Sequence, residues 1–317
     1  MVDLLSMYRL VGILPDAARV IFVGDTAQLP PVGNGLVFQA LTDTQIPFFN
    51  LTQVKRQNEE SGIHRFSTSV RNGQFDLPES TKNTLKESSD CSIETKPTLE
   101  RLITLWQESG GVDQSIVLSP IRKGEFGVNN LNVELQASVG NDRQAIYFQD
   151  SLRGWIPWIT STGSRLLKGD PVLVTANNYD EDADLRNGDL GLVVEVFEQP
   201  DENDAVAVIE VNNALINVNA ELLEKLHLGY AITIHKSQGS QWPSCFVMLP
   251  NEAEKMIDQT LLYTASTRPS ERLMLMGGER VIEKALLTGS IALKRKTFMS
   301  ERLILASKVS SDQACIR

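Results

Sequence analysis

Short apolar runs rich in β-branched residues recur along the chain, with polar, helix-like stretches between them. They lie at residues 19–23, 115–120, 245–249 and 272–276. The first run stops at Gly24 and Asp25. An apolar run that ends in this way is typical of a buried parallel strand followed by a polar loop. We therefore expect a mixed α/β fold with a parallel sheet, and ligands at the carboxyl ends of its strands.

The spacing of the apolar runs shortens between residues 169 and 218. Strands are expected at residues 171–175, 191–197, 205–211 and 214–218, with turn residues such as Asn187-Gly188 between them. Short strands with this turn chemistry predict a small β-barrel. The chain then divides into the end of a first α/β domain (1–48), a second α/β domain (49–168 and 219–317) and the inserted barrel (169–218).

Two further stretches differ from their neighbours in composition or hydrophobic periodicity. Residues 76–98 are rich in Ser, Thr, Lys and Glu, which predicts a surface loop. Residues 127–136 carry apolar side chains at helical spacing and predict an amphipathic helix. A last helix is expected at residues 294–303.

The composition narrows the class of protein. A net charge of −10 in 317 residues argues against a protein that coats nucleic acid nonspecifically, although it leaves room for one local groove. The three cysteines, Cys91, Cys245 and Cys315, are scattered, so neither a zinc site nor a disulfide framework is indicated. No apolar run is long enough to cross a membrane, and the N-terminus lacks the features of a signal peptide. We expect a cytoplasmic protein with no membrane partner.

The nine residues Gly24-Asp-Thr-Ala-Gln-Leu-Pro-Pro-Val32 form the first candidate site. Gly24 lets the backbone turn, Asp25 supplies a carboxylate, and Gln28 offers an amide that donates and accepts. The two prolines stiffen the exit of the segment. Gly-Asp alone is typical of an ordinary polar turn, but the full string is far more specific.

The segment from Gly229 to Trp242 carries the strongest signal. It places five hydrogen-bonding side chains beside Gly239, at Thr233, His235, Lys236, Ser237 and Gln238. Such a cluster can hold backbone phosphates and still contact a nearby nucleotide. Taken singly, His235 is better explained as a core histidine and Lys236 as a surface charge.

Two arginines are further candidate site residues. Arg56 lies within residues 50–61, and Arg268 closes residues 261–268. A planar guanidinium suits the spread charge of a phosphoryl group better than an ammonium does. Alone, Arg56 is typical of a solvated helix face, and Arg268 of a helix end favoured by the macrodipole.

Together, and in this order, the segments resemble the motifs of RecD-like superfamily 1 DNA helicases. The resemblance spans nearly the whole chain. It relates residues 24–32 to motif III, 50–61 to motif IV, 229–242 to motif V and 261–268 to motif VI. Residues 127–136 resemble a minor motif whose Asn and Gln orient the second domain. The resemblance implies RecA-like motor domains and an SH3-like barrel at residues 169–218.

The resemblance also implies roles for individual residues. The γ-phosphate of ATP would be contacted by Gln28, Arg56 and Arg268. The nucleotide site would also include Gly24, Asp25, Gly239 and Gln241. Single-stranded DNA would be held by Thr233, His235, Lys236, Ser237 and Gln238.

This sequence departs from the family pattern at two places. Gln241 stands where the family usually has Glu, which removes a charge-assisted hydrogen bond. Pro269-Ser270 follow Arg268 in place of Ala and a basic residue, and a proline there can end the helix early.

The sequence contains neither GxxxxGKS nor GxxxxGKT, the loop that cradles phosphates in these motors. Its residues 1–5, Met-Val-Asp-Leu-Leu, resemble the segment that directly follows the magnesium-binding Asp-Glu-Ala-Ser. We therefore expect the phosphate loop and the Mg²⁺ carboxylates outside this chain, and no metal site within it.

The sequence thus predicts the C-terminal motor portion of an ATP-dependent DNA helicase of repair or recombination, in which ATP and Mg²⁺ serve the complete motor. One alternative is a binding module for single-stranded nucleic acid. Another is a regulatory subunit of a nuclease–helicase complex; neither would have ATPase activity of its own. A hydrolase of small phosphorylated compounds is disfavoured, because nothing supplies an internal base and metal pair.

Overall fold

A six-stranded sheet forms the centre of the computed structural model, which describes residues 2–44, 46–51, 61–74, 84–86, 90–150, 152–180, 183–202, 204–290 and 292–314. Neighbouring strands from β2 to β13 are parallel, and β1 is antiparallel to β2. The order is β1 (Thr84–Lys86), β2 (Cys91–Glu94), β15 (Pro269–Gly277), β14 (Trp242–Leu249), β3 (Ser115–Ser119) and β13 (Ala231–Thr233). The prediction of a mixed α/β fold with a parallel sheet is confirmed.

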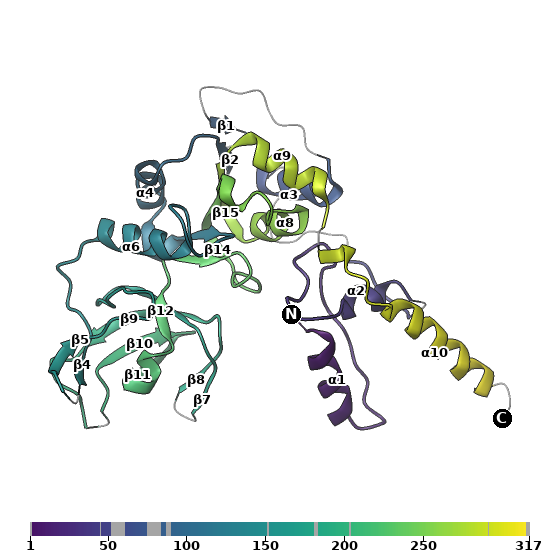
Figure 1. Cartoon of the computed structure of the whole chain (residues 1–317), viewed down its shortest axis with the longest axis horizontal. Helices are drawn as coiled ribbons and strands as arrows, with labels where there is room; N and C mark the ends of the chain where they lie inside the picture. Colours follow the sequence, from purple (N-terminus) through teal and green to yellow (C-terminus); the bar gives the residue numbers. More distant parts are fainter. Residues whose placement is uncertain are drawn as a thin grey trace.

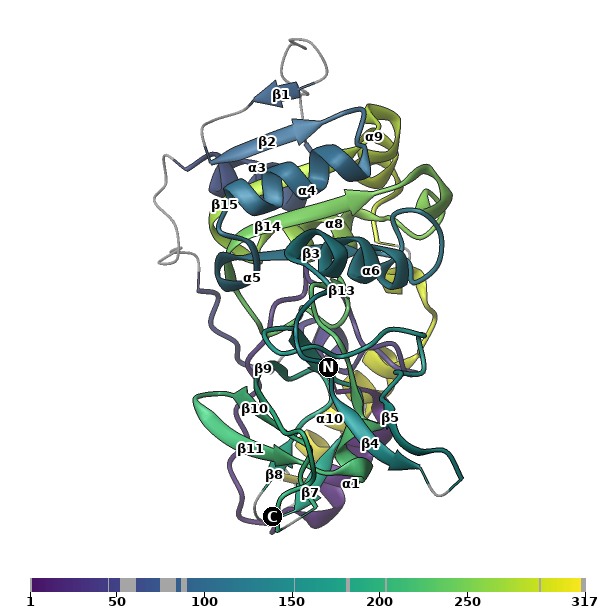
Figure 2. The same cartoon turned by 90° about the vertical axis from the view of Figure 1, so that its left-hand side faces the viewer.

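Helices cover both faces of this sheet (Figures 1 and 2). One face packs against α3 (Gly62–Asn72), α8 (Gln259–Ser266) and α9 (Glu279–Thr288), and the other against α4 (Leu99–Glu108) and α6 (Val128–Val139). Along β14, Val247 and Leu249 face the first group, whereas Phe246 and Met248 face the second. A strand covered on both sides is apolar throughout, which is why this strand could be predicted.

Along the chain, a five-stranded antiparallel sheet is inserted between β3 and β13. Its order is β11 (Ala214–Val218), β10 (Ala207–Val211), β9 (Leu190–Val196), β6 (Pro171–Val174) and β12 (Leu226–Leu228). Figure 1 shows its strands β9 to β12 below the parallel sheet. Antiparallel strands lie where the sequence predicted them, and β12 continues the sheet beyond residue 218. We call residues 169–228 the insertion. Its assignment as an SH3-like barrel and the three domain boundaries stay predictions.

Shorter elements complete the described chain. Two hairpins accompany the insertion, β4 (Tyr147–Asp150) with β5 (Gly154–Pro157) and β7 (Asn178–Asp180) with β8 (Ala183–Leu185). The remaining short helices are α5 (Gly111–Gln114), α7 (Ala220–Leu223), η1 (Asn251–Ala253) and η2 (Ala292–Lys294). The last helix, α10 (Met299–Ala314), begins later than predicted, because residues 292–294 form only a 3₁₀ turn. Among the described helices, none is both long and apolar enough to span a bilayer.

The N-terminal region contains α1 (Leu4–Ile13) and α2 (Val37–Thr42). The prediction of a buried parallel strand at residues 19–23 is wrong, since these residues form no strand and the side chains of Ile21 and Val23 are 87% and 86% exposed. A parallel strand becomes buried only between neighbouring strands and covering helices. No strand in the described part of the chain pairs with residues 19–23.

The loop predicted at residues 76–98 is wrong in part, because Cys91–Glu94 forms β2 between β1 and β15. This strand is only four residues long and buries two polar side chains, Ser92 and Glu94. Its composition therefore hides it from a search for apolar runs.

The edge strand β13 is completed by a side chain from α6. Asn132 Nδ2 donates to the Ala231 carbonyl oxygen at 2.9 Å, and Asn132 Oδ1 accepts from the Ala231 amide at 2.9 Å. Asn132 Nδ2 also donates to the Val128 carbonyl at 2.9 Å. The amide thus satisfies both main-chain groups of Ala231, as a further strand would, and fixes α6 to the strand that leads into the loop at 233–238.

Candidate nucleotide and nucleic-acid interface

Three of the predicted motif segments come together in the structure. The Leu29 amide donates to Thr264 Oγ1 of α8 at 2.8 Å. Gln238 Nε2, in the loop that follows β13, donates to the Leu29 carbonyl oxygen at 2.9 Å. Segments more than 200 residues apart along the chain therefore share one set of contacts.

Asp25 is the polar centre of the N-terminal part of this site. Its carboxylate accepts from Tyr263 Oη at 3.0 Å and from Gln28 Nε2 at 3.4 Å, and the Arg71 guanidinium lies 3.7 Å away. Burial, together with the neighbouring Asp25, raises the pKa of Tyr263. Arg71 was missed by the sequence analysis, because its only signal is a basic residue in the last turn of α3, where the macrodipole favours one anyway.

Arg268 is buried, and its guanidinium is directed at the protein. Nε donates to the Thr264 carbonyl at 2.9 Å, and Nη1 donates to the carbonyls of Ser240 at 3.2 Å and Ser237 at 3.4 Å. Arg268 therefore ties the end of α8 to the loop after β13. The helix does end early, at Ser266, and Pro269 opens β15.

The loop at 233–239 is held by its own hydrogen bonds. Ser237 is fully buried and donates from Oγ to the Ile234 carbonyl at 2.8 Å. Gly239 has a φ of 92°, in the left-handed region that favours glycine. Burial lowers the pKa of His235, opposed by the charge of Asp258, so this imidazole is neutral at pH 7.

Three basic side chains lie close enough to influence one another's pKa where this loop meets the insertion. They are Lys236, Arg122 from the loop after β3, and His227 from β12, and we call them the basic cluster. Lys236 Nζ donates to Asn187 Oδ1 of the insertion at 3.1 Å. Burial and the charges of Lys236 and Arg122 lower the pKa of His227, and burial and Arg122 lower that of Lys236. Positive charges on these groups repel one another, so an anion at the cluster would stabilise their charged forms.

A cavity of about 860 Å³ opens beside Asp25, between α2, α3 and the segment before α10. Arg71, Arg295 and Lys296 contribute positive charge to its lining. The residues that line it do not include Gln28 or Arg268, the described members of the predicted phosphate-contacting set. The cavity therefore lies beside the predicted phosphate site and does not coincide with it.

The remaining predicted site residues differ in exposure and in their contacts. Gly24, Gly239 and Gln241 are exposed, and Gln241 lies outside the contacts made by Leu29 and Thr264. Arg56 falls outside the described residues. In the part of the chain that the structure describes, no group of three or more His, Cys, Asp or Glu side chains is arranged to hold a metal ion.

Comparison with known proteins identifies two families. Residues 1–90 match the AAA domain family, and residues 228–276 match the UvrD-like helicase C-terminal domain family. The chain is 30% identical over 271 residues to the ATP-dependent RecD2 DNA helicase of Deinococcus radiodurans, covering 86% of this chain and 34% of that protein. It is 26% identical over 321 residues to the RecBCD enzyme subunit RecD of Mycolicibacterium smegmatis, covering 96% of this chain and 52% of that protein.

A solved structure of a Bacteroides Pif1 helicase with ADP-AlF3 and ssDNA aligns with a TM-score of 0.47 and 21% identity, covering 85% of this chain and 64% of that one. The sequence matches place this chain among relatives of superfamily 1 helicases. Within that class it is a RecD-like protein, as the ordered motifs predicted. The chain spans about a third to a half of the length of these curated relatives.

Proposed function

We propose that this chain is the C-terminal motor portion of an ATP-dependent DNA helicase or translocase, in which phosphate sensing is coupled to the grip on a single strand. The observation that carries the proposal is the contact of residues 25–29 with both α8 and Gln238. This contact links the segment with Gln28 to the loop that carries Lys236. A shift of either segment is then transmitted to the other through short hydrogen bonds.

The grip on the strand is assigned to the basic cluster and the loop at 233–238. Phosphate contacts by Lys and Arg dominate the affinity for nucleic acid, independently of sequence. Arg122, Lys236 and His227 come from three elements, so a backbone crossing between the loop and the insertion would meet all three. The net charge of −10 disfavours approach of DNA from a distance, and the local cluster offsets this at the site.

The nucleotide side is assigned to Gln28 and Arg268 among the described residues, with Arg56 as predicted from the sequence. ATP with Mg²⁺, when bound in the complete motor, supplies the free energy of phosphoryl transfer. Arg268 now donates to the carbonyls of Ser237 and Ser240. When the Arg268 guanidinium turns from these oxygens to a phosphate, the loop at 233–239 loses two hydrogen bonds. Phosphate sensing and single-strand binding are then coupled through Arg268.

Fluorescence anisotropy with labelled oligothymidylate tests the proposal on the purified 317-residue chain. We expect binding that weakens steeply with salt, a weaker response to duplex DNA, and ATP turnover at background, because the sequence lacks the phosphate loop. Absence of single-strand binding at 50 mM salt would overturn the strand-gripping role. Turnover by the pure chain would contradict the expectation that catalytic phosphate contacts lie elsewhere.

Single-strand binding should strengthen as the pH falls toward the lowered pKa of His227. The free protein holds the pKa of His227 low, through burial and the charges of Lys236 and Arg122. A phosphate in the basic cluster offsets those charges, so the complex takes up a proton and its affinity rises with acidity. The rise is at most about tenfold per pH unit, the limit for one proton.

Anisotropy titrations at several pH values, with His227→Gln beside the parent, measure this effect. The variant should show a flatter profile, and any remaining slope would belong to the half-buried His235. In the absence of DNA the linkage has the opposite sign, since a lowered pKa in the folded state costs stability as the pH falls. Identical profiles for parent and variant would exclude His227 from the site.

A further inference from the structure

A buried carboxylate, Asp170, sits where the insertion meets the parallel sheet. Its side chain has no exposed surface. Its main chain belongs to the insertion, because the Gly169 amide donates to the Val193 carbonyl at 2.7 Å and the Val193 amide donates to the Asp170 carbonyl at 2.9 Å. Asp170 must therefore move with the insertion.

Tyr230 approaches Asp170 from the other side. Its hydroxyl donates to Asp170 Oδ1 at 2.7 Å. Its main chain belongs to the parallel sheet, since the Val117 amide donates to the Tyr230 carbonyl at 3.2 Å. The Tyr230 ring meets the edge of Trp106, with centroids 5.9 Å apart. One side-chain hydrogen bond thus joins two sheets, three residues before the loop begins at Thr233.

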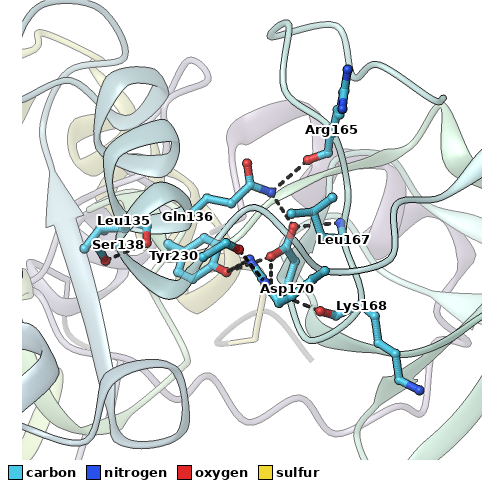
Figure 3. A network of polar contacts seen from close by, with 10 residues as sticks. Leu135, Gln136, Ser138, Arg165, Leu167, Lys168, Asp170 and Tyr230 are labelled. Carbon is cyan, nitrogen blue, oxygen red and sulfur yellow. Dashed lines mark hydrogen bonds and ion pairs between the residues drawn. The ribbon is translucent and has the colours of Figure 1, made fainter.

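Gln136 and Arg143 close the network around Asp170, and Figure 3 labels Gln136, Asp170 and Tyr230 within it. Arg143 Nη1 lies 2.7 Å from Asp170 Oδ1, and Nη2 donates to Tyr230 Oη at 3.3 Å. Gln136 of α6 donates from Nε2 to Asp170 Oδ2 and to the Arg165 carbonyl. The Leu167 amide also donates to Oδ2, at 2.8 Å. We call Gln136, Arg143, Asp170 and Tyr230 the joint.

We propose that the joint sets the position of the insertion against the loop at 233–238, and that Tyr230 is a positioning residue for single-strand binding. The inference rests on the proposed strand-gripping function. The basic cluster is divided between the two parts, with His227 on the insertion and Lys236 and Arg122 on the parallel-sheet part. The joint therefore determines whether the cationic groups face the same phosphates.

Polar contacts are well suited to this role, because the packing beside them is incomplete. A cavity of about 210 Å³ along the same seam is lined by Trp106, Leu190, Tyr230 and Trp242, among others. Apolar side chains of both parts share one core beside this cavity, but apolar contacts alone have little directional preference. A hydrogen bond to a buried charge is stronger than a neutral one and has a preferred direction, so it can fix the orientation instead.

The Tyr230→Phe variant tests the joint, because it keeps the ring and removes only the hydroxyl. Spin labels at Leu215→Cys and Leu287→Cys report the distance between the insertion and the parallel-sheet part; both native side chains are exposed, whereas Cys91 and Cys245 are buried. Cys315→Ser removes the third thiol. We expect a broader distance distribution in the variant and about tenfold weaker single-strand binding, the scale of one charge-assisted hydrogen bond.

The matched control is Tyr147→Phe, whose ring stacks on Trp155 in the β4–β5 hairpin, outside the joint. It should leave the distance distribution and the affinity unchanged. In a double-mutant cycle, Tyr230→Phe should cost less affinity when Lys236→Ala is already present, since the joint acts through the cluster. A general loss of stability would give additive effects and would overturn the proposal.

Arg143→Lys, at a partly exposed position, serves if Tyr230→Phe does not fold, since it keeps the charge and loses the forked geometry. An unchanged distance distribution in these variants would refute the joint. The distance measurement needs no DNA. A broadened distribution in a protein that binds no single strands would therefore support the joint and refute only the proposed function.

Discussion

The Asn132→Ala variant is expected to lose about 2–4 kcal/mol of unfolding free energy, the scale of two to three lost hydrogen bonds that leave buried main-chain groups without partners. Asn132 is buried and is bonded to both the amide and the carbonyl of Ala231 at the sheet edge. Water cannot replace the side chain there without opening the contact between α6 and β13. Urea unfolding followed by circular dichroism measures the loss, and the melting temperature should fall by about 5–10 °C.

Asn130→Ala is the matched control, because it makes the same substitution two positions away on the same helix. Asn130 donates to the Glu125 carbonyl at the surface, where water can take over the bond. It should cost about 0.5 kcal/mol or less, as is usual for surface substitutions. Equal losses for the two variants would show that Asn132 contributes only helix propensity and does not complete the sheet edge.

The double variant Arg122→Ala with Lys236→Ala should weaken single-strand binding about 25-fold at 0.1 M salt. Each phosphate contact on a single strand contributes roughly 0.7 to the slope of log affinity against log salt, which is about fivefold in affinity at that concentration. The slope itself should fall by about 1.4. Anisotropy titrations at four or more salt concentrations measure both quantities.

Arg280→Ala with Lys284→Ala is the control for net charge. This pair also consists of one Arg and one Lys, but both side chains lie on α9 and form ion pairs with Glu254. The control changes the total charge by the same amount and leaves the basic cluster intact. If both double variants lost the same affinity, binding would follow the overall charge, and the basic cluster would have no special role.

The core strands could be predicted because their sequences record burial on two faces. Strands β3, β14 and β15 were each expected within a few residues of where they lie. Residues 19–23 carry the same signal and are exposed, because apolar character shows that a segment can be buried and not that a neighbour is present. Strand β2 shows the reverse case, a short buried strand with two polar residues.

The candidate site likewise contains residues that the sequence could indicate and residues that it could not. Residues 233–238 are contiguous in the sequence, so the motif alone indicated the loop. Arg122, His227 and Arg71 reach the site from separate elements, and each is an ordinary polar residue in its own segment. Asp170 and Tyr230 both stood in segments that the sequence analysis had singled out. Their pairing across 60 positions could not be read from either segment.

The pairing of β6 with β12 has a consequence for the order of folding. Leu228 of β12 lies opposite Val172 of β6, so the chain leaves the insertion beside the point where it entered. The parallel sheet must bring Ala231 next to Val117, and the entropy lost in closing a loop grows with the logarithm of its length. An insertion that has already folded holds its two ends together and shortens that loop. We therefore expect the insertion to fold first and β13 to pair with β3 afterwards.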